Sequence, residues 1–266
     1  MSDPPTAAAP PAGSRLRLLS CNILAGASVG RYRHYVTRSW LPHRGKRANL
    51  DALAATFADF DLVGLQESDA GSLRSGFLNQ TEYLAEAAGF PFWSHQPNRK
   101  VAHLAASANG LISRFEPSEV IDYPLPGRIP GRGALYARFG DGADALVVVV
   151  AHLSLGPKAR ARQLDFIAGL LDGHAHAVLM GDLNCVPESA ELRQLFGHTT
   201  LRPPEARAPT FPSWRPQRAI DHILVSADLH VERLWTLPQA FSDHLPLAAM
   251  VSLPPNVRTT LGSADG

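Results

Sequence analysis

Short polar clusters lie at the ends of six apolar, strand-like runs, and this arrangement constrains the fold more than any other feature of the chain. The clusters are Cys21-Asn22, Gln66-Glu67, His152, Asp182-Leu183-Asn184, Asp221-His222 and Ser242-Asp243-His244. Carboxylates and imidazoles buried at strand ends are unfavourable unless they are paired or bound to a metal. Six such strand ends in a chain of 266 residues therefore predict one site on which the strands converge.

Apolar periodicity predicts strands and helices that are mixed along the chain. Strands are expected at residues 16–22, 62–65, 110–113, 133–139, 145–151, 177–181, 220–226 and 245–253. Helices are expected over residues 50–57, over 81–88 and from Pro157 onward, where the buried face is marked by Leu164, Ile167, Ala168 and Leu171. Elements mixed in this way suit an α/β fold built as a sheet-based sandwich with helices outside.

No linker, repeat or change of composition divides residues 15–253, which indicates a single domain. Residues 1–14 are rich in Pro and Ala and are expected to be a disordered tail rather than a signal peptide, and residues 254–266 a loose C-terminal tail. No apolar run approaches the length of a membrane span, so no stable membrane insertion is expected. Two cysteines make no disulfide framework, and free thiols fit a reducing compartment. We therefore expect a cytoplasmic protein, and we further expect a monomer.

The order of the polar clusters carries a family resemblance. Asn, Glu, His, Asp/Asn, Asp and Asp/His, in this order, resemble the endonuclease/exonuclease/phosphatase superfamily of DNase-like, metal-dependent phosphoesterases, and in particular its short bacterial members. The resemblance runs over residues 15–252. It implies a four-layer α/β/β/α sandwich, in which two mainly antiparallel sheets pack face to face between helical layers. It also implies hydrolysis of a phosphodiester or phosphomonoester by in-line attack of water, with Mg²⁺ or Mn²⁺ as the cofactor.

Chemistry supports roles for two of the acids. Glu67 closes an apolar run and is the best candidate ligand for a hard cation, although a lone acid there is as often a surface residue. Alternation along an extended segment sends Asp182 and Asn184 to the same side. A carboxylate there can orient and deprotonate water, while the amide donates to developing phosphorane charge. The alternative for this segment is an Asx-type turn.

Histidines and the remaining polar residues complete the predicted site. Asp221 and His244 are a candidate charge pair, in which the carboxylate favours the protonated ring and leaves its other nitrogen to bind phosphate. The resemblance implies that His152 contacts the phosphate or helps to protonate the leaving oxygen, and that His222 is a packing residue. The predicted catalytic residues are Asp182, Asn184, His244, Asp221, His152 and Asn22, and the predicted metal ligands are Glu67, Asp243 and Asn22.

The substrate is less well defined by the sequence. Predicted substrate-binding residues lie in loops or at the start of a helix, where a solvated surface is the alternative; they are Arg128, Arg132, Lys158, Arg160, Trp214 and Arg218. A formal net charge of +1 argues against a protein-wide surface for wrapping nucleic acid. A small phosphate ester or a lipid head group is therefore favoured, with an endo- or exonuclease acting on DNA or RNA as the alternative. The alternative of another class is a non-catalytic binding protein on the same fold. Its signature would be a substitution at one of five positions, and none is present at Glu67, Asp182, Asp221, Asp243 or His244.

Overall fold

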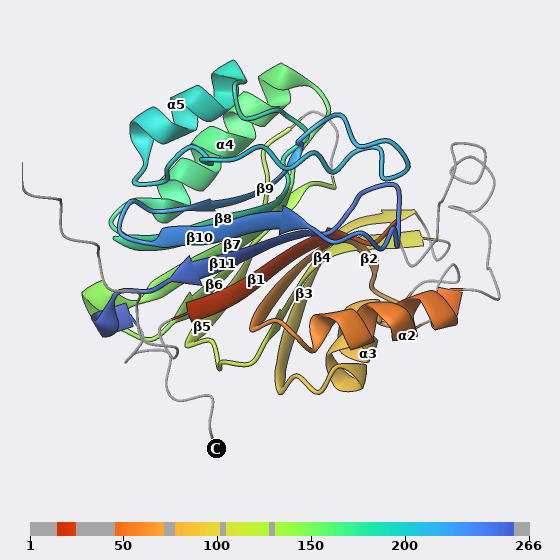
Figure 1. The fold of residues 1–266 in the computed structure, drawn as a ribbon. Helices are drawn as coiled ribbons and strands as arrows, with labels where there is room; N and C mark the ends of the chain where they lie inside the picture. The colour runs from red at the N-terminus through yellow and green to blue at the C-terminus, as the bar shows by residue number, and fades with distance from the viewer. Residues whose placement is uncertain (1–14, 25–45, 72–77, 102–104, 128–130, 258–266) are drawn as a thin grey trace, which may run out of the picture.

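Two β-sheets packed face to face form the centre of the molecule, as the computed structural model shows (Figure 1). The structure describes residues 15–24, 46–71, 78–101, 105–127 and 131–257. Across the six-stranded sheet the order is β10 (His230–Thr236), β11 (Leu247–Ser252), β1 (Arg15–Asn22), β2 (Leu62–Asp69), β4 (Ala105–Ser113) and β3 (Phe92–Val101). Across the five-stranded sheet it is β5 (Glu119–Pro124), β6 (Gly133–Phe139), β7 (Leu146–His152), β8 (His176–Asp182) and β9 (Asp221–Val225).

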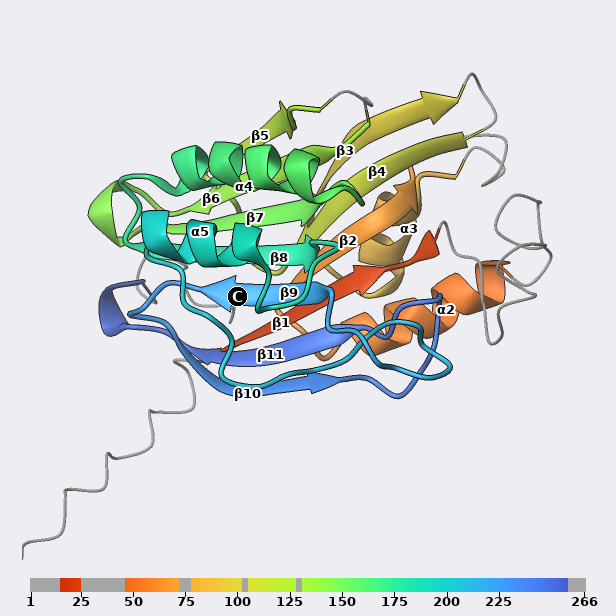
Figure 2. The ribbon, with the colours of Figure 1, turned by 90° about the horizontal axis from the view of Figure 1, so that it is seen from above.

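Helices cover the outer face of each sheet, so the molecule has four layers (Figures 1 and 2). The six-stranded sheet is covered by α2 (Lys46–Phe57) and α3 (Gln80–Ala87), and the five-stranded sheet by α4 (Pro157–Leu171) and α5 (Ala190–His198). A short 3₁₀ helix, η4 (Gly142–Asp144), precedes β7. The pairs β1–β2 and β7–β8 are parallel, and the other pairs of named strands are antiparallel. The predicted four-layer sandwich with mainly antiparallel sheets is confirmed.

Three hydrophobic clusters hold these layers together. The largest lies between the sheets, where Leu16 and Leu18 of β1 face Val148 of β7 and Met180 of β8. The residues predicted for the buried face of α4 pack on the outer side of the five-stranded sheet, as expected. Every residue of β7 is buried, because this central strand is covered on both faces.

Some elements differ from the sequence prediction. The strands β3, β5 and β10 were not predicted, because β3 and β10 are edge strands with mixed polar sequences and β5 is exposed along much of its length. The helix α5 was not predicted either. Val257 is fully buried in the cluster between the sheets, so the packed chain extends past the predicted boundary at residue 253. The predicted tail at residues 1–14 lies outside the described residues. In the described part of the chain, no helix is both long and apolar enough to cross a membrane.

Candidate active site

The polar clusters predicted from the sequence meet at one end of the sandwich. The parallel strands β1 and β2 both run toward this end, and β1 ends there at Asn22. In the other sheet, His152, Asp182 and Asp221 are in register across β7, β8 and β9. Strand pairing therefore places side chains from distant parts of the chain next to one another.

Side-chain alternation explains why three of these residues point between the sheets. Leu16 and Leu18 of β1 face the inter-sheet core, and Asn22 keeps the same parity. His152 likewise continues the inward face of β7, as Asp182 continues that of β8. The alternation of side chains along each strand, which builds the core, therefore also places polar groups at the open end of the core.

Glu67 reaches the site by a different route. Leu62 of β2 faces the inter-sheet core, so strict alternation would turn Glu67 to the outer face. A bulge between Leu65 and Ser68 breaks the register with β4, and Glu67 has a positive φ of 56°. A bulge of this kind re-aims a side chain. As a result, Glu67 Oε1 lies 3.3 Å from Asn22 Nδ2.

The centre of the cluster is the carboxylate of Asp182, which is almost fully buried. Its Oδ2 accepts a hydrogen bond from Asn22 Nδ2 at 3.3 Å and lies 3.3 Å from His152 Nε2. His152 Nε2 is also 3.9 Å from Glu67 Oε1. Asp182 and Glu67 thus both contact Asn22 and His152, and they lie on opposite sheets at the same open end of the sandwich.

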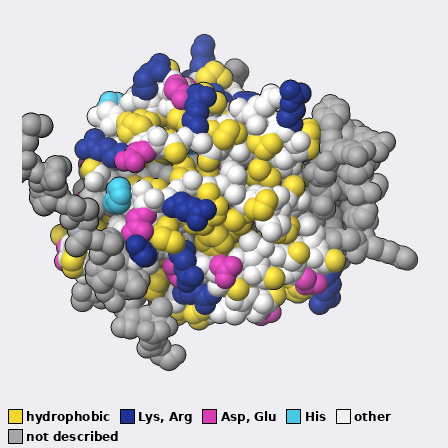
Figure 3. Space-filling view, in the orientation of Figure 1, with side chains coloured by type: hydrophobic (Ala, Val, Ile, Leu, Met, Phe, Trp, Pro, Cys, Tyr) yellow, Lys and Arg dark blue, Asp and Glu magenta, His cyan; other side chains and the backbone are white. Residues whose placement is uncertain are grey.

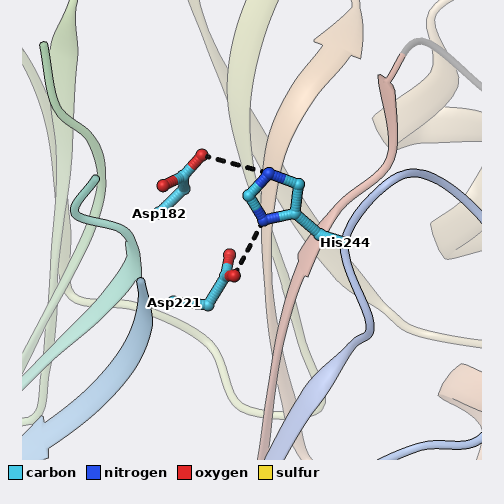
Figure 4. Close-up of side chains that lie close together, drawn as sticks. All are labelled: Asp182, Asp221 and His244. Atoms are coloured by element: carbon cyan, nitrogen blue, oxygen red, sulfur yellow. Dashed lines mark hydrogen bonds and ion pairs between the residues drawn. The ribbon is translucent and has the colours of Figure 1, made fainter. Parts of the chain in front are cut away.

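A second set of contacts links Asp182 to Asp221 through His244 (Figure 4). Asp221 Oδ2 lies 2.8 Å from His244 Nδ1, and His244 Nε2 lies 3.8 Å from Asp182 Oδ2. Burial lowers the pKa of His244, but the charge and hydrogen bond of Asp221 outweigh it and raise the pKa to about 10. His244 is therefore an imidazolium at neutral pH, held between two carboxylates.

Two buried acids near this imidazolium keep raised pKa values in spite of its charge. Burial raises the pKa of Asp182 to about 7; the charge of Asp221 adds to this and that of His244 opposes it. Burial also raises the pKa of Asp243 to about 6; the charge of His244 opposes this shift and the charge of Glu67 adds to it. In contrast, burial and the charge of Arg132 lower the pKa of His152 well below its usual value, so this ring is neutral.

These carboxylates have the chemistry of a site for a hard divalent cation. Glu67, Asp182 and Asp243 offer oxygen ligands, and the charge of Glu67 raises the pKa of both aspartates, which a bound cation would relieve. Ligand atoms of Asp182, Asp221 and His244 also lie within 4.8 Å of one another, close enough to hold a metal ion. A protonated imidazole cannot be a ligand, however, so the pairing of His244 with Asp221 favours the side of the opening that carries Glu67 and Asp243.

Asn184 lies beside the cluster in a different geometry from the one predicted. The extended segment ends at Asp182, and Asn184 has a positive φ of 54°. Its backbone N–H donates to Asp182 Oδ1 at 3.0 Å, and its Nδ2 donates to the carbonyl of Leu153 at 2.9 Å. The alternative of an Asx-type turn is therefore the correct description of this segment, and Asn184 ties the loop after β7 to the loop after β8.

Gly181→Ala is expected to destabilise the protein by roughly 3 kcal/mol or more. An added Cβ would lie 1.9 Å from the carbonyl oxygen of Ala151 on the paired strand, and Gly181 has a φ of 144°. Urea denaturation followed by circular dichroism measures the loss. Gly169→Ala in α4 is the matched control, because a Cβ there meets nothing within 4 Å and alanine favours a helix. A loss below about 1 kcal/mol for Gly181→Ala would contradict the close strand contact.

The predicted substrate-binding residues are not all at the opening. Arg132 lies close enough for its charge to lower the pKa of His152. Lys158, Trp214 and Arg218 are exposed in the segments after β7 and before β9. Arg160 is instead buried against Glu191, with nitrogen and oxygen 2.7 Å apart, and donates to the carbonyl of Leu155. Arg160 is thus placed to hold the loop together, and Arg128 lies outside the described residues.

Two residues in contact with the cluster were not predicted. Thr210 is fully buried, and its hydroxyl donates to Asp221 Oδ2, the same oxygen that His244 Nδ1 contacts. Ser242 Oγ accepts from the backbone N–H of His244 at 3.0 Å and donates to the carbonyl of Asn22. Ser242 lies in a polar cluster that the sequence marked, but the hydroxyl of a lone serine or threonine does not indicate its partner. His222 is buried and contacts the carbonyl of Cys185, consistent with packing.

The pair of Asp221 and His244 predicts a pH-dependent stability. The pKa of His244 is raised from 6.5 to about 10 in the folded state. The pair therefore contributes fully to the free energy of unfolding below pH 6.5, and this contribution is lost as the pH rises toward 10. In metal-free protein, Asp221→Asn should cost roughly 3–5 kcal/mol near neutral pH and flatten this dependence. Urea denaturation between pH 6 and 10 tests this. The pair of Asp228 and His176 supplies the control: Asp228 is partly exposed, so Asp228→Asn should lower the stability less than Asp221→Asn does. If the free energy of unfolding changed with pH by the same slope in wild type and in Asp221→Asn, the pairing would be contradicted.

Comparison with known proteins shows which family has this arrangement of residues. A sequence profile described as the Endonuclease/Exonuclease/phosphatase family matches residues 19–244. The comparison with curated proteins gave no match. Among solved structures, the chain is similar to an endonuclease/exonuclease/phosphatase from Beutenbergia cavernae, at 20% identity and a TM-score of 0.70 over 90% of this chain and 72% of that chain.

Two further structures are similar over nearly their full length. One is the human Nocturnin catalytic domain, at 18% identity and a TM-score of 0.68 over 91% of this chain and 95% of that chain. The other is a mannosyl-6-phosphatase from Bacteroides thetaiotaomicron, at 19% identity and a TM-score of 0.65 over 90% of this chain and 100% of that chain. At such identities these structures show a shared fold, whereas the family profile spans the whole cluster from Asn22 to His244. The chain therefore belongs to the endonuclease/exonuclease/phosphatase family, whose members are hydrolases of phosphoester bonds and generally use a divalent metal.

Proposed function

We propose that this protein hydrolyses a phosphodiester with Mg²⁺ or Mn²⁺ held by Glu67 and Asp243, assisted by Asn22. The observation that carries the proposal is the buried carboxylate of Asp182, which lies 3.3 Å from both His152 Nε2 and Asn22 Nδ2 and faces the imidazolium of His244. Oxygen ligands at crowded acids suit a hard cation better than a soft one. When bound, such a cation neutralises phosphate charge and stabilises the leaving oxygen.

The chain's own residues supply the base and the hydrogen-bond donors. Asp182, with a pKa raised to about 7, can accept a proton from the attacking water near neutral pH. His244 stays protonated against Asp221 and can hold a phosphoryl oxygen through Nε2–H. His152 is neutral, which favours a hydrogen bond to the phosphate over proton donation to the leaving oxygen. Thr210 and Asp221 fix the orientation of the His244 ring.

We propose a small or head-group phosphodiester as the substrate. The exposed cations of the segments after β7 and before β9, Lys158 and Arg218, together with Arg132, can bind a short anionic ligand but do not form an extended surface for a duplex. The net charge of +1 agrees with this. Nuclease activity and phosphomonoester hydrolysis are the alternatives. Glu67, Asp182, Asp221, Asp243 and His244 are all present, which favours an enzyme over a binding protein.

A substrate panel with added Mg²⁺ or Mn²⁺ tests this proposal. It would compare bis-p-nitrophenyl phosphate, p-nitrophenyl phosphate, inositol phosphates, phospholipid vesicles, RNA, and single- and double-stranded DNA. Asp182→Asn prepared in parallel reports any contaminating activity. We expect turnover of a small or head-group diester with mild salt dependence. Nanomolar binding to duplex DNA with a salt slope of about five phosphates or more would instead support the nuclease alternative.

We further propose that the protein works as a cytoplasmic monomer. Cys21 and Cys185 are free and buried, which agrees with a reducing compartment. Burial raises the pKa of the Cys185 thiol to about 11, so this residue is placed as an inert packing group. Size-exclusion chromatography with light scattering tests the oligomeric state.

A further inference from the structure

A row of buried polar side chains crosses the six-stranded sheet just below the candidate active site. Its members are Ser20 of β1, Gln66 of β2, Asn109 of β4 and Gln96 of β3, and these strands are neighbours in this order. Charged side chains on the surface of the molecule are open to water (Figure 3), whereas none of these four residues is more than 4% exposed. The polar atoms of the row therefore depend on partners inside the protein.

The row lies between the two sheets. A Cβ added to Gly64, two residues before Gln66 on β2, would contact side chains of the opposite sheet. Gln66 faces the same way, because alternate residues of a strand share a face. Asn109 Nδ2 donates to the carbonyl of Gly133 in the opposite sheet at 2.8 Å. Gln96 Nε2 likewise donates to a carbonyl of β5 at 3.0 Å, so the row connects the two sheets as well as the four strands.

The hydrogen bonds of the row are interrupted at its centre. Ser20 Oγ donates to Gln66 Oε1 at 3.4 Å, and Asn109 Nδ2 donates to Gln96 Oε1 at 3.4 Å. Between these two contacts, Gln66 Nε2 and Asn109 Oδ1 are buried and have no hydrogen-bond partner in the part of the chain that the structure describes. One of these atoms is a donor and the other is an acceptor. Because an unpaired polar group is unfavourable in the interior, the two atoms require a shared partner.

This interruption lies at the bulge that carries Glu67. In the pairing of β2 with β4, Gln66 and Glu67 together lie opposite Asn109. The side chain of Glu67 makes long contacts, with Oε1 at 3.3 Å from Asn22 Nδ2 and at 3.9 Å from His152 Nε2. The direction of Glu67 therefore depends on how the backbone of the bulge is held. Gln66 is the residue of the bulge whose side chain enters the interior beside Asn109.

We propose that Gln66 Nε2 and Asn109 Oδ1 hold one buried water between them, and that this bridge fixes the bulge that directs Glu67. The water accepts a hydrogen bond from Gln66 and donates one to Asn109, so that both unpaired atoms gain a partner. Asn109 is itself bonded to the opposite sheet, so the bridge ties the bulge to both sheets. Gln66 and Asn109 are thus positioning residues that act through Glu67, and their effect on metal binding rests on the function proposed above.

Crystal structures of the metal-free wild type and of Gln66→Met, at a resolution that shows ordered waters, test the bridge. Methionine keeps the length of the side chain and removes the amide, and Gln66→Leu serves the same purpose if Gln66→Met does not fold. In the wild type, a water is expected within hydrogen-bond distance of both Gln66 Nε2 and Asn109 Oδ1. In the variant, this water should be lost and Glu67 Oε1 should move out of hydrogen-bond distance of Asn22 Nδ2. A wild type without this water would overturn the proposal, as would an unmoved Glu67 in the variant.

Calorimetric titration of Mn²⁺ into the full-length protein separates positioning from general stability. Gln66→Met should weaken Mn²⁺ binding about tenfold, as loss of a group that orients a metal ligand does. Leu62→Ala is the matched control, because Leu62 lies on the same face of β2 and is fully buried; it should lower the melting temperature at least as much and leave the Kd for Mn²⁺ unchanged. An unchanged Kd in Gln66→Met, with weaker binding in Glu67→Gln, would overturn the positioning role. An unchanged Kd in Glu67→Gln would contradict the metal assignment instead, and the position of Glu67 in the two crystal structures would then decide the role of the bridge.

Discussion

Asp182→Asn is expected to lower kcat on bis-p-nitrophenyl phosphate by about a thousandfold, while metal affinity changes little. The amide keeps the size of the side chain and one oxygen for contact with Asn22 Nδ2, which lies 3.3 Å from Asp182 Oδ2. It cannot accept the proton that the attacking water must release. Steady-state kinetics together with calorimetric titration of Mn²⁺ would separate the two effects.

A surface acid provides the control for this experiment. Asp228 is partly exposed and pairs with His176 in a separate contact, so Asp228→Asn should keep nearly the wild-type rate. A loss of only a few-fold in Asp182→Asn would show that another group takes the proton. In that case the raised pKa of Asp182 would reflect burial without a catalytic role.

Removal of divalent metal by EDTA is expected to abolish hydrolysis, and Mg²⁺ or Mn²⁺ should restore it. The reason is the crowding of acids at the opening, where the charge of Glu67 raises the pKa of both Asp182 and Asp243 and hinders binding of an anionic substrate. Activity measured against free metal concentration checks this. Circular dichroism of the chelated protein is the control, because the fold is held by its apolar clusters and should persist. Full activity after exhaustive chelation would rule out the metal assignment.

The sequence predicted those parts of the site that follow regular alternation. Asn22, His152 and Asp182 continue the inward faces of their strands, so apolar periodicity and strand ends were sufficient to bring them together. Glu67 was identified by its polarity, but its direction depends on a bulge and a positive φ, which no periodicity reveals. Asn184 was placed on the same side as Asp182 by alternation, whereas the strand had already ended.

Loops and edges were the parts that the sequence described least well. Arg160 belongs by sequence to a basic segment, yet its buried pairing with Glu191 depends on how α4 packs on α5. Edge strands such as β10 have too mixed a pattern for a strand to be recognised. Such features arise from tertiary contacts between segments that are distant along the chain, which local pattern cannot specify.

The most direct test of the central claim is the dependence of hydrolysis rate on free Mn²⁺ concentration in wild type, Glu67→Gln and Asp182→Asn. If Glu67 holds the metal and Asp182 acts on water, Glu67→Gln should need a higher Mn²⁺ concentration for half-maximal rate and recover much of its activity at saturation. Asp182→Asn should keep the wild-type midpoint at a far lower plateau. The same midpoint in wild type and Glu67→Gln, with Asp182→Asn near the wild-type plateau, would contradict the account.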